Sequence, residues 1–485
     1  MKYPATTNFI GGKFVNSSSP KTLEVISPID GTLLSKVCLS TAADLDEAVA
    51  SSKKAFAAWS KTPIKERVQV FFRYKTLLER DIDSLATLCS EENGKIMAES
   101  VAEIEKCIEL TEFACSLPQL VSGELLEVSR GVECRTEHVP LGVVASIVPF
   151  NFPGMVPNWT IPNAIALGNC MIMKPSEKVP LSVGKLAMLL KEAGLPDGVL
   201  NVVHGDQEIV EAICDHPDIE AISFVGSTKV AKIVYRRATQ NYKRCLALGG
   251  AKNHLIVLPD AIPEMTAQNV AASMSGCAGQ RCMAASAMVG VGDVDNIIDK
   301  ICGEAKKIIP GKNLGAVINK DSQEKIERYI TEAEEQGAKI LVDGRKAHVE
   351  GKENGTYVGP TVIDYVTPDM SVAKEEIFGP VISIMRTKTV DEALAIENAN
   401  PYGNAASVFT QNGGMARYII DKASAGMIGV NVGVPVPREP FSFGGWNESK
   451  FGVGDITGKS SIEFWTKLKK STVKWNAEAG INWMS

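Results

Sequence analysis

The stretch LGVVASIVPF (141–150) is apolar throughout, and it opens the part of the sequence that decides the fold. Four similar runs follow it, separated by segments with helical spacing: CMIMKPS (170–176), VLNVVHG (199–205), EAISFVGS (220–227) and CLALGG (245–250). Strands without polar alternation that are joined by helices of roughly 10–15 residues are typical of parallel βαβ units covered on both faces. We therefore predict an α/β fold with a doubly wound parallel sheet, which binds ligands at the carboxyl ends of its strands.

Regular patterns continue on both sides of this stretch. Residues 44–118 are strongly helical: Asp44 is a plausible N-cap for the first helix, and amphipathic stretches follow over 65–80 and 81–112. A second α/β pattern begins at HLIVLPD (254–260) and continues through a helix over 263–276, the strand ASAMVGV (285–291) and a helix over 293–308. These patterns predict a second α/β domain after residue 250.

Two segments outside these patterns have the character of β-hairpins. They are residues 120–140 and the tail KLKKSTVKWN (467–476). We expect the two segments to pair and to form an appendage outside the main domains.

The composition is that of a folded protein with more than one domain. A chain of 485 residues exceeds the size at which a single hydrophobic core stops growing, so two or three domains are expected. Hydrophobic residues make up 45% and charged residues 22%, which is ordinary for a soluble globular protein. The net charge of −6 argues against a nucleic-acid partner, because phosphate binding needs a basic surface.

Cysteine usage and hydropathy favour a cytoplasmic protein. The 11 cysteines are an odd number without CxxC spacing, which favours a reduced protein over a disulfide scaffold. The five histidines are scattered and offer no zinc-like spacing with the cysteines, so no metal site is expected. Prolines interrupt the apolar stretch 141–168, and the N-terminus has no signal-peptide or transit character, so no membrane partner is expected.

The segment SGCAGQRCMAAS (275–286) contains two cysteines among small residues. A reactive thiolate needs space for a substrate and an electropositive neighbour that lowers the pKa of the thiol, and Cys282 directly follows Arg281. Cys277 is expected on the preceding helix. Most free cysteines are small buried hydrophobic residues, so the spacing alone leaves both interpretations open for Cys282.

The segment AGQRCMA (278–284) resembles the nucleophile segment of the aldehyde dehydrogenase family. Other motifs of that family occur in the family's order along the chain: VPFNFP (148–153), MKPSE (173–177), FVGST (224–228) and EEIFGPV (375–381). Each motif alone is weak, but five in order are highly specific, and the resemblance extends from residue 8 to residue 452. It implies the aldehyde dehydrogenase fold, Cys282 as the nucleophile, and a homo-oligomer that is a tetramer or a dimer.

Asn151 lies where the strand over 141–150 ends, so its side-chain amide could donate a hydrogen bond into a cleft. The resemblance implies that this amide forms an oxyanion hole with the backbone N–H of Cys282. One such donor typically contributes about 3–4 kcal/mol to transition-state stabilisation. Without the resemblance, an asparagine shortly before a proline is more typical of a turn.

The resemblance also assigns residues to a nicotinamide cofactor. Lys174 and Glu177 would flank the adenosine ribose, where a carboxylate pairs with free hydroxyls and repels a 2′-phosphate. This favours NAD, while NADP remains open. Lys178 is a further candidate contact and is equally typical of a solvated surface lysine.

The rest of the cofactor site is expected along FVGST and EEIFGPV. Gly226 permits a close approach of the backbone, and Ser227 at a helix N-terminus suits a pyrophosphate, although serine is also a common N-cap. Glu376 resembles the family's glutamate that holds the nicotinamide ribose. Three further residues are expected to line the same site: Val148, Phe150 and Gly249.

These roles predict a covalent mechanism. The thiolate of Cys282 attacks the aldehyde, and the oxyanion of the resulting hemithioacetal meets Asn151. Hydride transfer to the nicotinamide then leaves a thioester on Cys282.

The stretch LALGGAKNH (246–254) departs from the hydrolytic members of the family, which usually carry a glutamate directly before Leu-Gly-Gly. Ala247 occupies that position and cannot accept a proton, so the general base for a deacylating water is absent. The CoA-acylating methylmalonate-semialdehyde dehydrogenases tolerate this loss because coenzyme A takes the acyl group, and GAKNH (250–254) and PFNFPGMVP (149–157) resemble that branch. We therefore expect acyl transfer to coenzyme A.

That branch, as the resemblance implies, holds the substrate carboxylate with two arginines. One matches Arg281, and the other falls on Lys106, whose ammonium lacks the bidentate fork of arginine. We expect a small anionic semialdehyde such as methylmalonate or malonate semialdehyde, while a sulfonated or phosphorylated aldehyde stays open. Lys106 is equally typical of a surface lysine on a helix.

Two alternatives to the CoA-acylating enzyme remain open. The first is a hydrolytic NAD(P)-dependent dehydrogenase that releases a carboxylate, and the second is a binding or structural protein, against which the retained Cys282 argues.

For the domain organisation, we expect a cofactor domain, a catalytic domain and oligomerisation strands. Their ranges are 1–119 with 140–249 for NAD binding, 250–440 for catalysis, and 120–139 with 466–485 for the oligomerisation strands.

Overall fold

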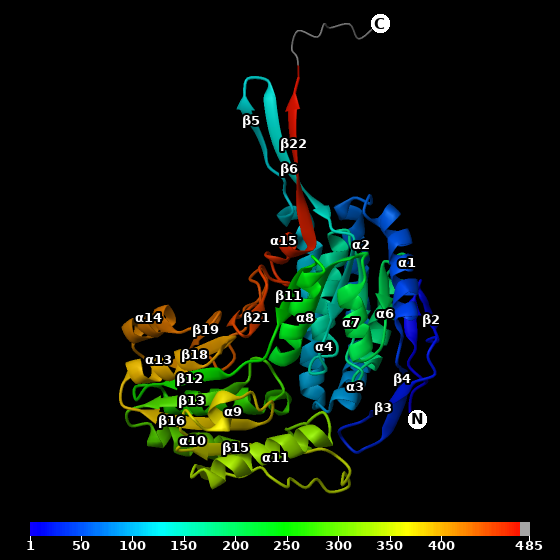
Figure 1. Cartoon of the computed structure of the whole chain (residues 1–485). Helices are drawn as coiled ribbons and strands as arrows, with labels where there is room; N and C mark the ends of the chain where they lie inside the picture. The colour runs from blue at the N-terminus through cyan, green and yellow to red at the C-terminus, as the bar shows by residue number, and fades with distance from the viewer. Residues whose placement is uncertain (476–485) are drawn as a thin grey trace, which may run out of the picture.

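Two sheets with parallel strands at their centres organise residues 1–475, the part of the chain that the computed structural model describes (Figure 1). The first sheet has the order β2-β1-β9-β8-β7-β10-β11-β21. Its strands are parallel from β9 to β11, and antiparallel strands complete both edges. The bounds are β1 (Asn8–Ile10), β2 (Lys13–Val15), β7 (Val143–Ile147), β8 (Cys170–Lys174), β9 (Leu200–Val202), β10 (Ile219–Val225), β11 (Arg244–Leu248) and β21 (Lys450–Phe451).

The second sheet has the order β14-β15-β16-β13-β12-β18-β19, and all its strand pairs are parallel except β14 with β15. The chain passes from the first sheet to the second between β11 and β12, and β21 later returns to the first sheet. The bounds are β12 (Asn253–Val257), β13 (Ala285–Val291), β14 (Lys339–Val342), β15 (Thr361–Asp364), β16 (Val381–Thr387), β18 (Ala405–Phe409) and β19 (Met427–Val430). The predicted doubly wound plan and the second α/β pattern are both confirmed.

Helices cover both faces of the sheets. Successive side chains of a central strand point to opposite faces, so they enter different cores. In β8, Met171 and Met173 pack with α4, α5 and α6, whereas Ile172 packs with α1, α7 and α8. The helices of the first half are α1 (Ala42–Trp59), α2 (Ile64–Arg80), α3 (Ile82–Asn93), α4 (Met97–Leu120), α5 (Met155–Ala166), α6 (Leu181–Glu192), α7 (Gln207–Asp215) and α8 (Thr228–Gln240). Those that follow are α9 (Pro263–Ser275), α10 (Asp295–Ala305), α11 (Lys320–Glu335), α12 (Ser371–Lys374), α13 (Val390–Ala399), α14 (Gly413–Lys422) and α15 (Ser461–Trp465).

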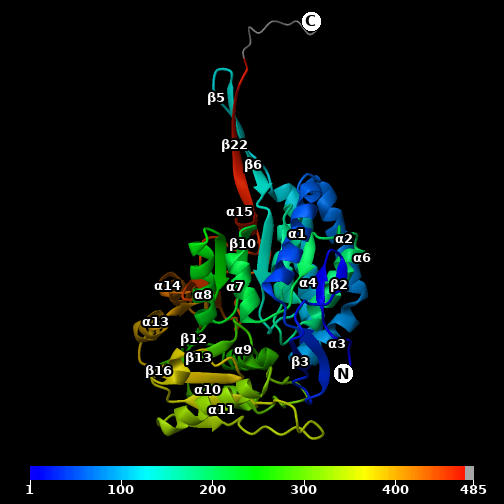
Figure 2. The ribbon, with the colours of Figure 1, turned by 45° about the vertical axis from the view of Figure 1, so that its right-hand side comes forward.

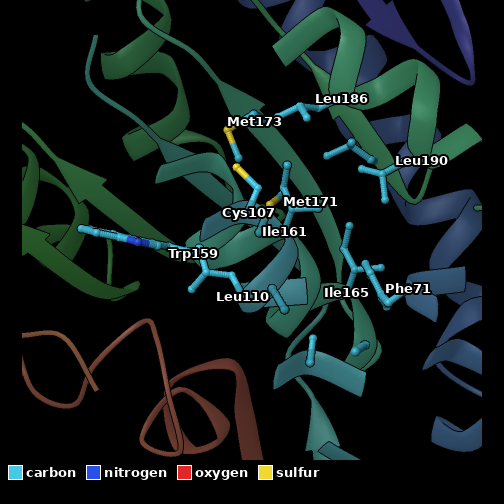
Figure 3. Close-up of a cluster of buried hydrophobic side chains, with 14 of the residues drawn as sticks. Phe71, Cys107, Leu110, Trp159, Ile161, Ile165, Met171, Met173, Leu186 and Leu190 are labelled. Carbon is cyan, nitrogen blue, oxygen red and sulfur yellow. The ribbon is translucent and has the colours of Figure 1, made fainter. Parts of the chain in front are cut away.

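The core on one face of the first sheet supports the segment that follows β7. Figure 3 shows Ile161 and Ile165 of α5 packed against β8 and neighbouring helices. Leu186 and Leu190 of α6 belong to the same core. Each such buried aliphatic side chain contributes roughly 1.5–3 kcal/mol relative to exposure. This packing fixes α5, and therefore the residues just before it, relative to the sheet.

A three-stranded arm projects from the body in both views (Figure 1, Figure 2). It consists of β5 (Leu125–Ser129), β6 (Val132–Pro140) and β22 (Thr466–Lys474), all antiparallel, with Leu468 opposite His138. The expected pairing of the two segments is confirmed, but the tail is a single strand rather than a hairpin, because it contains no turn residue such as glycine. Residues 476–485 of the expected oligomerisation segment lie outside the described residues.

The predicted helical region before the first sheet is confirmed, with two corrections. The N-cap of α1 is Thr41, and Asp44 is the third helical residue, whose carboxylate accepts the Thr41 N–H at 2.8 Å in a capping box. The stretch over 81–112 is broken at Gly94, whose φ of 92° ends α3. The short strands outside both sheets and the arm are β3 (Thr22–Ile26), β4 (Leu33–Cys38), β17 (Tyr402–Gly403) and β20 (Trp446–Asn447).

The helices and the acidic, cysteine and histidine side chains of residues 1–475 bear on membrane and metal binding. Within this range, every helix is too short or too polar to cross a membrane. The same range contains no cluster of three or more His, Cys, Asp or Glu side chains that could hold a metal ion.

Candidate active site

A cavity of about 230 Å³ lies where the carboxyl ends of β7, β10 and β11 meet loops of the second half. Parallel pairing places Val225 opposite Leu248, so FVGST and the Gly249–Gly250 turn leave the sheet side by side. The cavity is lined by Pro149, Phe150, Asn151, Phe152, Val156, Trp159, Val225, Gly226, Ser227, Gly249, Gly250, Cys282, Ser322, Lys325, Glu376, Ile377 and Phe378. The site therefore brings Cys282, Asn151, Gly226 and Glu376 together, as the sequence predicts.

Cys282 follows a left-handed turn. Cys277 was expected on the preceding helix, but α9 ends at Ser275 and Cys277 lies in the turn, with a φ of 53°. Gly279 in the same turn has a φ of 71°, and a Cβ there would lie 2.0 Å from the carbonyl oxygen of Gly379. Only glycine fits this contact, which ties the nucleophile segment to the loop that carries EEIFGPV.

Two buried asparagines fix the backbone of Cys282. The Nδ2 atoms of Asn253 and Asn404 donate hydrogen bonds to the Cys282 carbonyl oxygen at 2.7 and 2.9 Å. Asn253 is the first residue of β12, and Asn404 directly precedes β18. The central strands of the second sheet therefore position the backbone of Cys282.

The environment of Cys282 favours the neutral thiol. Burial raises the pKa of Cys282 to about 12, and the charge of Glu376 adds to this increase. Arg281 lowers the pKa, as expected from the sequence, but its effect is smaller than that of burial. The net effect is therefore opposite to the sequence-based expectation, and the thiol is protonated at neutral pH in this environment.

Asn151 lies in the bend between β7 and α5, lines the cavity wall and is 5% exposed. Its Nδ2 donates to the carbonyl oxygen of Gln280 at 3.0 Å, two residues before the nucleophile. An asparagine amide has two N–H groups, so one remains for a developing oxyanion.

The turns after β10 and β11 have no room for side chains. A Cβ on Gly226 would lie 2.6 Å from the Phe224 ring, and one on Gly249 would lie 2.7 Å from the carbonyl oxygen of Glu448. Ser227 is the N-cap residue of α8, and its side chain makes no capping hydrogen bond. The hydroxyl and the helix N-terminus are therefore available to an anionic group.

Glu376 reaches the cavity from the second half of the chain. Its Oε1 accepts the backbone N–H of Ala251 at 3.1 Å, and burial raises its pKa to about 7. The nearby Lys252 is buried, and burial lowers its pKa to about 7 even though Glu376 and Glu375 act in the opposite direction. The carboxylate thus changes charge close to neutral pH.

The remaining cofactor candidates lie outside this cavity. Lys174 is buried at the end of β8, and its Nζ lies 3.3 Å from Oε2 of Glu177. The Nζ of Lys178 lies 5.1 Å from the centre of the Phe150 ring, and Lys178 lines a separate cavity of about 360 Å³. Val148 is 5% exposed and lines neither cavity. Phe150, which was expected beside it in the cofactor site, lines the cavity of about 230 Å³.

A further cavity of about 440 Å³ is also lined by Cys282. It shares Phe152, Trp159 and Cys282 with the first cavity. Its other lining residues are Lys106, Glu109, Met155, Arg281, Met283, Val432, Val434, Val436, Pro437, Arg438, Glu439, Phe443 and Thr457. The two residues expected to bind substrate, Lys106 and Arg281, therefore lie on the same cavity as the nucleophile.

Lys106 is not a solvated surface lysine. Its Nζ lies 2.7 Å from Oε2 of Glu439 and 3.2 Å from Oε2 of Glu109, so two carboxylates already neutralise it. Arg281 uses its Nη2 for the carbonyl oxygens of Ala272 and Ser273, and its Nε has no hydrogen-bond partner among residues 1–475. Because Nε is buried, Nη1 is the donor that Arg281 keeps without a hydrogen-bond partner among residues 1–475.

A family model described as the aldehyde dehydrogenase family matches residues 14–471. The chain belongs to the aldehyde dehydrogenase family. This aldehyde dehydrogenase is 45% identical over 483 residues to malonate-semialdehyde dehydrogenase 1 of Geobacillus kaustophilus, covering 98% of this chain and 99% of the relative. It is 42% identical to the human mitochondrial acylating methylmalonate-semialdehyde/malonate-semialdehyde dehydrogenase, covering 98% of this chain and 90% of the relative.

Solved structures of aldehyde dehydrogenases have the same fold. The crystal structure of methylmalonate-semialdehyde dehydrogenase from Oceanimonas doudoroffii aligns with a TM-score of 0.96 at 42% identity, covering 98% of this chain and 99% of that chain. A Sinorhizobium meliloti protein solved in complex with NAD aligns with a TM-score of 0.97 at 41% identity, covering 99% of each chain. The predicted aldehyde dehydrogenase fold is therefore confirmed.

At the position of the family's usual glutamate, this aldehyde dehydrogenase has a residue without access to the site. Ala247 lies on β11, is fully buried, and packs in the core formed with α7 and α8. Among the described residues that line the first cavity, Glu376 is the only carboxylate. No acidic side chain therefore replaces the missing base from the same strand.

Sequence reasoning missed several residues of the aldehyde dehydrogenase site. Arg438 and Glu439 lie in VPVPREP (434–440), which has neither helical nor strand periodicity and therefore offers no local signal of its position. Asn253 and Asn404 hold the Cys282 backbone, and the only signal in the sequence is an asparagine beside an apolar strand run.

Proposed function

We propose that this aldehyde dehydrogenase oxidises a small anionic semialdehyde, such as methylmalonate or malonate semialdehyde, with NAD and transfers the acyl group to coenzyme A. The observation that carries the proposal is the position of Cys282, which lines both the cavity with the expected cofactor residues and the cavity with Lys106 and Arg281. The names of the relatives agree with this substrate class.

The residues at the first cavity fit a dinucleotide. Gly226 and Gly249 keep the two turns close to their neighbours, because a Cβ at either position would meet protein atoms, and Ser227 offers a hydroxyl without a capping hydrogen bond at a helix N-terminus. Lys174 and Glu177, with Lys178 as a further contact, would hold the adenosine ribose, and Glu376 would hold the nicotinamide ribose. When bound, NAD supplies the hydride acceptor.

The chain itself supplies the covalent chemistry. Loss of the thiol proton to solvent lets the Cys282 thiolate attack the aldehyde carbon, and the free N–H of Asn151 together with the Cys282 backbone N–H stabilises the oxyanion that forms. Loss of hydride from the hemithioacetal leaves a thioester on the sulfur. Arg281, which lines the second cavity, binds the distal anionic group of the substrate through Nη1.

Release of the acyl group to coenzyme A follows from the absence of a base at Ala247. A thiol with a pKa near 8.5 is partly ionised at neutral pH and is a strong nucleophile, so it needs less assistance than water. The buried position of Ala247 in the core supports this choice, because no proton acceptor can act from there.

We also propose roles for the larger parts of the chain. Residues 1–119 and 140–249 form the NAD-binding domain, and residues 250–440 form the catalytic domain. The arm, which contains 120–139 and the strand that starts at 466, joins subunits of a homo-oligomer, a dimer or a tetramer. Its exposed apolar side chains support this role: Leu125, Leu126, Val128 and Leu468.

The test is NADH formation from malonate and methylmalonate semialdehyde, with and without coenzyme A, with product analysis by mass spectrometry. We expect a single burst without coenzyme A, steady turnover with it, and an acyl-CoA product. Cys282→Ala should abolish both phases. Turnover that is equally fast without coenzyme A would instead support the hydrolytic alternative.

A further inference from the structure

A buried ion pair lies behind the cavity wall, outside the residues assigned above. Lys95 and Glu103 form a salt bridge, and their side chains are 1% and 0% exposed. The Nζ of Lys95 also donates to the backbone carbonyl oxygen of Asn151 at 2.6 Å, and it lies 3.9 Å from the centre of the Phe152 ring. The ammonium therefore contacts two consecutive residues of the cavity wall.

Glu103 holds the other end of the same segment. Its Oε1 accepts the backbone N–H groups of Gly154 and Met155 at 2.8 and 3.0 Å, at the start of α5. The first N–H groups of a helix have no partner within the helix, and a carboxylate is the preferred charge there. The pair thus holds the segment 151–155 by hydrogen bonds at both ends, through Lys95 at Asn151 and through Glu103 at Gly154 and Met155.

The local sequence places both side chains. Gly94 ends α3 in a left-handed conformation and turns the chain inward, so Lys95 is buried before α4 begins. Burial opposes the charge on Lys95, but the charge of Glu103 keeps the pKa of Lys95 above its ordinary value. Lys95 therefore stays charged inside the protein.

Stability alone does not account for this pair. Replacing a buried ion pair with apolar side chains often leaves stability unchanged or increases it, because desolvation offsets the attraction between the charges. The contacts of Lys95 and Glu103 instead converge on the segment that carries Asn151. A misplacement of about 1 Å at such a group can slow a reaction roughly 100-fold.

We infer that Lys95 and Glu103 are positioning residues that set the backbone of Asn151, so that its amide meets both Gln280 and the oxyanion on the Cys282 adduct. This inference rests on the proposed function, in which Asn151 stabilises that oxyanion. The pair itself does not touch the substrate or the nucleophile.

The first test is a double-mutant cycle on the rate of the NADH burst, with Lys95→Met, Asn151→Ala and the combined variant. Removal of an oxyanion donor costs about 10²–10³-fold, so Asn151→Ala should slow the burst by this amount and Lys95→Met by at least about tenfold. If Lys95 acts through Asn151, the combined variant should be no slower than Asn151→Ala alone. Additive losses would overturn the inference.

The second test separates positioning from general damage. Alkylation of Cys282 by iodoacetamide forms no oxyanion, so its rate in Lys95→Met should equal that of the wild type. Lys95→Arg, which keeps the charge and a donor, should recover part of the burst rate. A parallel loss of alkylation and burst rates would show disruption of the whole site and overturn the inference.

If Lys95→Met does not fold, Glu103→Gln tests the same prediction of a slower NADH burst. Glu92→Gln is the matched control for this variant. Glu92 is also fully buried and also accepts two N–H groups at a helix start, those of Leu181 and Ser182 at 2.7 and 2.9 Å. Glu103→Gln should slow the burst, while Glu92→Gln should leave its rate unchanged. Equal losses in both variants would overturn the inference.

The two proposals fail in different ways. A burst unaffected by Asn151→Ala would overturn the oxyanion role in the proposed function, and this inference with it. A slow burst in Asn151→Ala combined with a normal burst in Lys95→Met and Glu103→Gln would overturn this inference alone.

Discussion

At the scale of single residues, the charge of Glu376 raises the pKa of the Cys282 thiol. Burial raises the pKa of Cys282 to about 12, and Glu376 contributes to that increase. Because the pKa of Glu376 is raised to about 7, its negative charge is present mainly above neutral pH. The thiolate is therefore disfavoured most strongly in the range where Glu376 is ionised.

This coupling predicts the effect of Glu376→Gln on the free enzyme. Removing the negative charge lowers the pKa of Cys282, so alkylation by iodoacetamide should be faster than in the wild type at about pH 8. The difference should shrink below about pH 7, where the wild-type carboxyl group is protonated. The alkylation rate as a function of pH, followed by mass spectrometry, tests this expectation.

Glu375→Gln is the control for this measurement, because Glu375 lies on the same loop but hydrogen-bonds to Tyr329. It should leave the alkylation rate of Cys282 near that of the wild type. Slower alkylation in Glu376→Gln would contradict the electrostatic argument.

Lys106 and Glu439 give a second prediction at this scale. The carboxylate of Glu439, 2.7 Å from the Lys106 ammonium, competes with an anionic substrate for the same charge. Glu439→Gln should therefore lower the KM for malonate semialdehyde by roughly fivefold, which corresponds to about 1 kcal/mol. Steady-state kinetics with saturating NAD and coenzyme A measure the change.

Glu109→Gln provides the comparison, because Glu109 lies farther from Lys106 and its side chain is more exposed, at 39% against 10% for Glu439. Its effect on KM should be smaller. A higher KM in Glu439→Gln would show instead that this carboxylate contributes to substrate binding.

At the scale of elements, the sequence predicts the regular parts of the fold well. The apolar runs of the first sheet coincide with β7 to β11 within a few residues, because prolines and glycines end each run. The motif resemblance also identifies Cys282, Asn151 and Glu376, which the fold brings to one cavity. Local pattern and motif order are sufficient for these features.

Features that depend on distant contacts are absent from the pattern. The pattern over 81–112 predicts one helix, but the chain breaks at Gly94. Ala316 from the second half of the chain packs against this glycine, and local sequence does not indicate that contact. The ion pair of Lys106 with Glu439 joins residues 333 positions apart. No local periodicity encodes such pairs, so the substrate cavity could be predicted only in part.

At the scale of the whole molecule, the arm exposes apolar side chains that no other part of the described chain covers. Leu125, Leu126 and Leu468 are more than half exposed on a sheet that projects from the body in both views (Figure 1, Figure 2). Exposed apolar residues gathered on one element are typical of an interaction surface. A second copy of this chain is the partner in our proposal.

We therefore expect Leu126→Glu combined with Leu468→Glu to shift the protein to a smaller species without unfolding it. These side chains contribute little to the core of one chain, so the melting of the monomer should change little. Light scattering after size-exclusion chromatography measures the mass. Met188→Glu, an exposed position on α6, should leave the mass unchanged, and an unchanged mass in the double variant would count against the arm as the interface.

The shared position of Cys282 in two cavities also bears on how the two ligands meet. In the proposed function, the dinucleotide occupies the first cavity and the aldehyde occupies the second. The two lining sets share only Phe152, Trp159 and Cys282 among the described residues. The two ligands would therefore meet at one sulfur while most of the side chains that set their affinities remain separate.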